Sequence, residues 1–125
     1  MNRLSLAFFS TGALCVMGGM VWGMVMGSKQ DFTLAPAHAH LNLVGWASLA
    51  LMGTFYALSG KGGRLGWINY GLSTTGVVIM IPSLAIMLSG NQAFEAPVIV
   101  GSVIAALGMA TFLFVVLSCW RDAKA

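Results

Sequence analysis

The segment AHAHLNLVGWASLALMGTFYAL, residues 37–58, has no Asp, Glu, Lys or Arg and is long enough to cross a membrane. A helix needs roughly 20 apolar residues to cross a hydrocarbon core about 30 Å thick. Three further segments meet this requirement, at about residues 4–26, 65–88 and 94–120. None of the four alternates polar and apolar residues with the period of two that is typical of a strand. We therefore predict an all-α integral membrane protein, built as a bundle of four transmembrane helices.

The composition of the chain leads to the same class of protein. Its 125 residues are 58% hydrophobic and 7% charged, whereas soluble domains are nearer half apolar and a quarter charged. A chain of this length is expected to be a single domain, covering residues 1–125. The net charge of +3 bears on orientation in the membrane, and we expect no nucleic-acid partner.

The basic residues predict which side of the membrane holds each loop. Four spans place both termini on the same side. Only Lys29 falls on the opposite side, and the other basic residues share the side of the termini: Arg3, Lys61, Arg64, Arg121 and Lys124. Positive charge accumulates on the cytoplasmic side of membrane proteins. We predict a multi-pass protein of the bacterial inner (plasma) membrane with cytoplasmic termini, so that the second helix begins at the outer face.

Glycines mark where the helices should approach one another closely. Gly19, Gly23 and Gly27 recur at intervals of four in the first span. Small residues with this spacing let two backbones pack together in lipid. The contact is expected either inside the four-helix bundle or against a second copy of the chain.

The two histidines of the chain, His38 and His40, lie near the outer end of the second span. An ionisable residue inside a membrane usually marks a functional site, although a histidine at a helix end can also be simply hydrated. Positions two apart on an α-helix are about 200° apart around the axis, so these rings should point to opposite sides. Asn42 follows one turn after His38, and Trp46 continues that face. We predict a binding site made of His38, His40, Asn42 and Trp46.

The donor set narrows the choice of cofactor. Zinc requires three or four donors, and no Cys, Asp or Glu is placed to join the histidines. Copper could use histidine together with Met17, Met20 and Met24, but packing is the favoured role of these methionines. Haem needs one or two axial histidines and an apolar slot. Because the chain lacks the C-x-x-C-H attachment motif, we predict non-covalent haem b, with copper as the less favoured cofactor.

The segment PAHAHLNLVGWASLALMGTFY, residues 36–56, resembles the haem-ligating helices of haem-copper oxidase subunit I and of the large subunit of nitric oxide reductase. In the large oxidases, one helix carries H-x-H, and its two histidines bind two different haems on opposite flanks. Subunit I of that superfamily has twelve helices in three four-helix arcs, and this chain is similar to one arc. The resemblance implies that His38 and His40 are axial ligands of haem iron, and it gives Asn42 no role.

The chain departs from that superfamily at the metal site. It has no second histidine-bearing helix and no set of three histidines for copper, and Tyr56 lies on the same helix as the histidines. The expected function is therefore electron transfer or diatomic-gas (O₂ or NO) chemistry, and whether the chain is itself an oxidoreductase stays open. The alternatives are a non-enzymatic scaffold subunit of a larger respiratory or photosynthetic complex, and a four-helix transporter or channel.

The number of histidines also predicts assembly. A haem with two histidine ligands needs a second chain, because the other three helices contain no histidine. In a closed ring, His38 of one protomer would face His40 of the next, and the three-arc likeness favours a homotrimer. A two-fold dimer that pairs like histidines is the second possibility. A redox partner protein could also supply the missing ligand.

Overall fold

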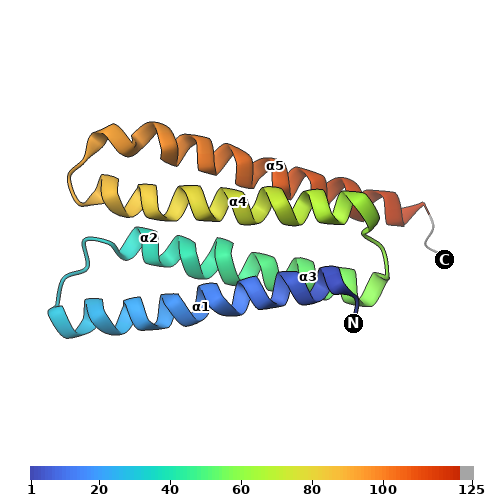
Figure 1. The fold of residues 1–125 in the computed structure, drawn as a ribbon, viewed down its shortest axis with the longest axis horizontal. Coiled ribbons are helices and arrows are strands. Elements are labelled where there is room, and N and C mark those ends of the chain that lie inside the picture. The colour runs from blue at the N-terminus through green and yellow to red at the C-terminus, as the bar shows by residue number, and fades with distance from the viewer. Residues whose placement is uncertain (122–125) are drawn as a thin grey trace.

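The computed structural model describes residues 1–121, which form four long helical stretches arranged as two hairpins (Figure 1). Each stretch is long and apolar enough to cross a membrane, which confirms the predicted number of helices. The predicted boundaries agree with the observed ones to within a few residues. In chain order the elements are α1 (Arg3–Lys29), α2 (Ala35–His40), η1 (Leu41–Ser48), α3 (Leu49–Ser59), α4 (Gly63–Leu88), η2 (Gln92–Phe94) and α5 (Glu95–Trp120).

The second span differs from the single α-helix that the sequence predicts. It begins as α2, continues as the π-helix η1 and returns to α-helical geometry in α3. A π-helix pairs residues five apart, one more than in an α-helix, and is often found at functional sites. The wider geometry begins at Leu41, directly after His40.

Local chemistry explains where the first two spans begin and end. The Asn2 side chain accepts a hydrogen bond from the Ser5 backbone N–H at 2.8 Å and caps α1. Gln30 adopts a left-handed conformation and ends that helix, with its N–H directed at the last carbonyls. Pro36 lies in the first turn of α2, where a helix does not need the N–H that proline lacks.

The second hairpin packs through small residues. A Cβ added to Gly101 of α5 would lie 2.6 Å from the backbone nitrogen of Met80 on α4. Gly76 of α4 meets Ala105 and Gly108 of α5 meets Ser73 in the same way. The backbones of α4 and α5 are therefore in close contact along much of their length.

A buried cluster joins the two hairpins near the end where α1 starts and α5 finishes. Phe8, Leu49 and Tyr56 are fully buried there. The amide of Asn69, on α4, donates a hydrogen bond to the Tyr56 hydroxyl at 2.9 Å, and its oxygen accepts one from Ser73 at 3.0 Å. A satisfied polar group of this kind fixes how α3 and α4 meet inside an apolar interior.

The predicted glycine contact on α1 lies inside the bundle. Gly19 and Gly23 face the second span, whereas a Cβ at Gly27 would have no atom of a neighbouring helix among residues 1–121 within 4 Å. The packing role predicted for Met17, Met20 and Met24 is wrong for the bundle, because each is 60–65% exposed. Lipid is as apolar as a protein core, so apolar side chains need not turn inward.

The charged residues separate along the long axis of the molecule. Figure 1 shows that α1 starts and α5 finishes at the same end of the bundle. By their positions in the chain, that end holds Arg3, Lys61, Arg64 and Arg121, and the other end holds Lys29, Asp31 and Glu95. Lys124, which also counted toward the predicted orientation, falls outside the described residues.

Candidate functional site

The loop before the histidines is held by one carboxylate. Asp31 accepts hydrogen bonds from the Thr33 hydroxyl at 2.7 Å and from the Thr33 backbone N–H at 3.1 Å. These two bonds, together with the charge of nearby Lys29, lower the pKa of the Asp31 carboxyl below its ordinary value. The loop then leads into α2, where Pro36 and both histidines lie.

His40 has an exposed ring whose tautomer is fixed by the backbone. Its Nδ1 lies 2.7 Å from the carbonyl oxygen of Pro36. A carbonyl oxygen only accepts hydrogen bonds, so Nδ1 must carry the proton and donate it. Nε2 of the neutral ring is then left with a free lone pair on an exposed side chain. Histidines that bind metals commonly donate their other ring N–H to a backbone carbonyl in this manner.

His38 points the other way, into the contact between α1 and α2. A Cβ added to Gly23 would lie 3.1 Å from His38 Cε1, and the Trp22 ring meets the imidazole edge to face at 6.4 Å between centroids. The Asn42 side-chain nitrogen lies 3.3 Å from His38 Nε2. His38 Nδ1 is buried and has no hydrogen-bond partner among residues 1–121.

Asn42 and Trp46 continue the face of His38, as their spacing predicts. The Asn42 amide oxygen fills the position that a Cβ on Gly19 would take, and it too is buried without a hydrogen-bond partner in the described part of the chain. The Trp46 ring covers Gly12, with Cε3 3.1 Å from the position of a Cβ there. We call His38, Asn42 and Trp46 the glycine-facing row, since each contacts a glycine of α1.

The predicted site is therefore divided between two surfaces. The glycine-facing row lies between the first two spans, and His40 lies on the outside of the same helix. The helical period predicts that the two rings diverge, but residue spacing alone does not indicate which ring α1 contacts. Pro36, whose carbonyl orients His40, is not part of the predicted site. Every residue has a backbone carbonyl, so the residue type does not indicate this role.

The side chains that could bind a metal fit the two candidate cofactors, haem b and copper, unequally. Within residues 1–121, no three His, Cys, Asp or Glu side chains come together as they would around a metal ion. Haem requires fewer protein ligands, and the bare Nε2 of His40 can serve as one. The His38 ring is half-buried against α1 and Asn42 lies beside its Nε2, so haem binding by His38 would require these contacts to open.

Comparison with known proteins adds no family to this geometry. No family model matches the chain, and neither the curated proteins nor the solved structures contain a significant match.

Proposed function

We propose that this protein is a b-type cytochrome of the bacterial inner membrane with cytoplasmic termini, in which His40 is an axial ligand of haem b. The observation that carries the proposal is the 2.7 Å contact between His40 Nδ1 and the Pro36 carbonyl. This contact leaves Nε2 as a free donor to iron on an exposed apolar surface. When bound, haem would supply one-electron redox chemistry, used for electron transfer or for reactions of O₂ or NO.

The residues of the chain would do three things at this site. Pro36 holds the imidazole in one tautomer and one orientation, which removes the need to reorganise the ring on binding. The exposed side chain of Leu43, three residues after His40, offers an apolar surface to the cofactor. The glycine-facing row keeps α2 and η1 against α1, so that the helix carrying His40 is held in place.

The contact of the half-buried His38 with α1 changes which assembly we favour. A head-to-tail ring that pairs His38 with His40 would require α1 to move away from His38. A two-fold dimer that pairs His40 with His40 uses only the exposed rings and leaves the contacts of each protomer intact. We therefore propose a homodimer with one haem between two copies of His40, and the homotrimer becomes the alternative.

Optical spectroscopy of purified variants tests the ligand assignment. The reduced wild-type protein should show the Soret and α bands of a b-type haem. His40→Ala should lose most of the bound haem, whereas His38→Ala should retain it. Leu51→Ala is a control at an exposed position of α3, away from His40, and should keep the haem.

Two outcomes would overturn the proposal. An unchanged haem-to-protein ratio in His40→Ala would show that His40 is not the ligand. Wild-type protein that lacks haem but copurifies with a fixed partner would favour a scaffold subunit.

A further inference from the structure

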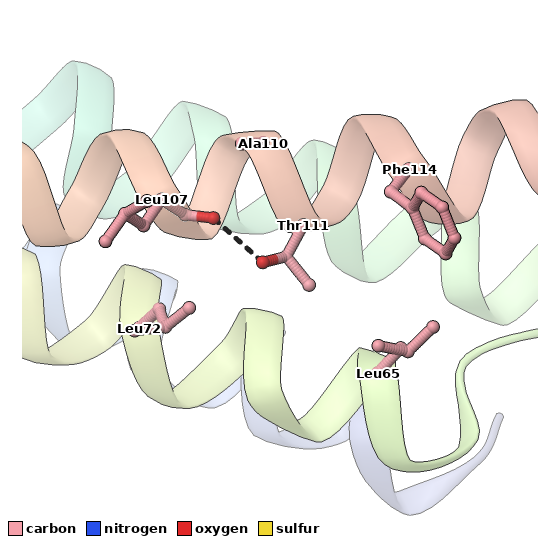
Figure 2. Close-up of a pocket in the computed structure, with 6 residues that line it drawn as sticks. All are labelled: Leu65, Leu72, Leu107, Ala110, Thr111 and Phe114. Carbon is pink, nitrogen blue, oxygen red and sulfur yellow. Dashed lines mark hydrogen bonds between the residues drawn. The ribbon is translucent and has the colours of Figure 1, made fainter.

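A groove runs along the surface of the bundle between α4 and α5 (Figure 2). Its lining residues are distant in sequence from the two histidines. It has a volume of about 390 Å³ and is lined by Leu65, Leu72, Leu107, Ala110, Thr111 and Phe114. A second hollow of about 250 Å³ is lined by Phe114, Leu117, Ser118 and Arg121. Phe114 lines both, so the two hollows lie next to each other along α5, and we call them together the α4–α5 groove.

The α4–α5 groove offers hydrocarbon contacts and few polar ones. The Thr111 hydroxyl donates its hydrogen bond to the Leu107 carbonyl at 2.8 Å, as the dashed line in Figure 2 marks. The Ser118 hydroxyl donates to the Val115 carbonyl at 2.6 Å. Both donors are used within α5, so a polar ligand would leave its own groups unpaired, whereas a hydrocarbon chain would not.

The length of the groove suits one leaflet of a bilayer. Leu107 lies near the middle of α5 and Arg121 directly follows its last residue. The distance between them along the helix is about 21 Å, compared with a hydrocarbon core about 30 Å thick. The groove therefore extends from the middle of the span to the membrane surface.

Within residues 1–121, the side chains at the open end of the groove carry positive charge. Arg121 lines that end, and Arg64 precedes the lining residue Leu65. The two carboxylates within residues 1–121, Asp31 and Glu95, lie at the opposite end of the bundle. Basic residues in this position attract anionic lipid headgroups.

We propose that the α4–α5 groove binds an anionic phospholipid, with one acyl chain against Leu72, Leu107 and Phe114 and the headgroup phosphate at Arg121. The proposal is independent of haem binding, because the groove shares no residue with the histidine site. Its two parts make separate predictions: the arginine selects the headgroup, and the apolar lining holds the chain.

Native mass spectrometry of the full chain in detergent can test both parts. Phosphatidylglycerol and phosphatidylcholine with identical acyl chains are added in turn, and the retained lipid is counted. Wild-type protein should retain phosphatidylglycerol in preference. Arg121→Gln should weaken phosphatidylglycerol retention by about fivefold, the effect of losing one arginine near an anionic headgroup. Arg3→Gln removes a charge at the same end of the bundle and should leave lipid retention unchanged.

Variants that fill the groove test the acyl-chain contact separately from the headgroup contact. Ala110→Phe and Leu72→Trp place bulk in the groove from α5 and α4, and both should reduce retention of either lipid. Ala106→Phe adds the same bulk one turn away, on an exposed position outside the lining, and should have no effect. Circular dichroism confirms that each variant keeps its helical content, and retention is compared between variants that do.

Three results would overturn the proposal. The groove does not hold lipid if both filling variants retain it as Ala106→Phe does. The headgroup is not at Arg121 if Arg121→Gln behaves as Arg3→Gln does. A change in the number of associated chains, with lipid retention unaltered, would instead make the groove a contact between copies of the protein.

Discussion

A single backbone carbonyl decides the chemistry of His40. The Pro36 carbonyl accepts from Nδ1 at 2.7 Å, so the lone pair of the neutral ring is on Nε2 of an exposed side chain. His38, two residues earlier, has the same side chain, but its ring packs against Gly23 and its Nε2 lies 3.3 Å from the Asn42 side-chain nitrogen. Two identical side chains thus differ in exposure and in hydrogen-bond partners because their surroundings differ.

The tautomer of His40 can be measured directly in the haem-free protein. We expect ¹⁵N spectra of histidine-labelled protein, at a pH where the ring is neutral, to show a protonated Nδ1 and an unprotonated Nε2. His40→Gln identifies which signals belong to this ring. A neutral His40 with its proton on Nε2 would contradict the contact with Pro36 and the ligand assignment that depends on it.

At the scale of elements, the contact between α1 and the second span depends on glycines placed opposite large side chains. The sequence predicted that Gly19, Gly23 and Gly27 share a face, and two of them do contact α2 and η1. Gly27 lies one turn beyond the region where α2 begins to cover α1. Where this contact ends depends on the path of the loop between α1 and α2. The spacing of the glycines does not predict that path.

Gly19→Ala should therefore destabilise the protein, since its methyl group would collide with the Asn42 amide. Overpacking of this kind costs about 1–3 kcal/mol. Gly27→Ala has free space and should be neutral or stabilising by up to about 1 kcal/mol, because alanine favours the helix more than glycine does. Unfolding in detergent followed by circular dichroism measures both, and equal stabilities would show that Asn42 does not pack on Gly19.

The contact between α3 and α4 depends on the buried hydrogen bond from Asn69 to Tyr56. Tyr56→Phe leaves the amide donor without its oxygen acceptor, and a stranded buried donor costs about 1–3 kcal/mol of stability. In an Asn69→Ala background the same change strands no donor, so its effect should shrink. An undiminished effect there would mean that the hydrogen bond does not link the two helices.

How far the sequence predicts each element depends on the range of the interactions involved. Hydropathy located all four helices that are long and apolar enough to cross a membrane, because that requirement depends only on local length and composition. The π-helix at Leu41–Ser48 was not predicted, and no residue in it is a specific signal for that geometry. Met17, Met20 and Met24 were assigned to packing, but in lipid an apolar stripe does not reveal whether it faces a helix or the membrane.

At the scale of the whole molecule, charge separates the two ends and predicts the orientation. In a background without Cys15 and Cys119, Ser28→Cys should react with an impermeant thiol reagent added outside the cell. Ser59→Cys, at the other end of the bundle, should react only after the membrane is opened. The reverse pattern would invert the orientation and place the histidines toward the cytoplasm.

Native mass spectrometry of gently solubilised protein tests whether two copies of His40 hold one haem, because it counts chains and haem in the same ion. We expect a dimer that carries one haem in wild-type protein and in His38→Ala, and haem-free chains in His40→Ala. A haem-loaded trimer that loses its haem in His38→Ala would restore the head-to-tail arrangement. Haem that remains bound in His40→Ala would contradict the account.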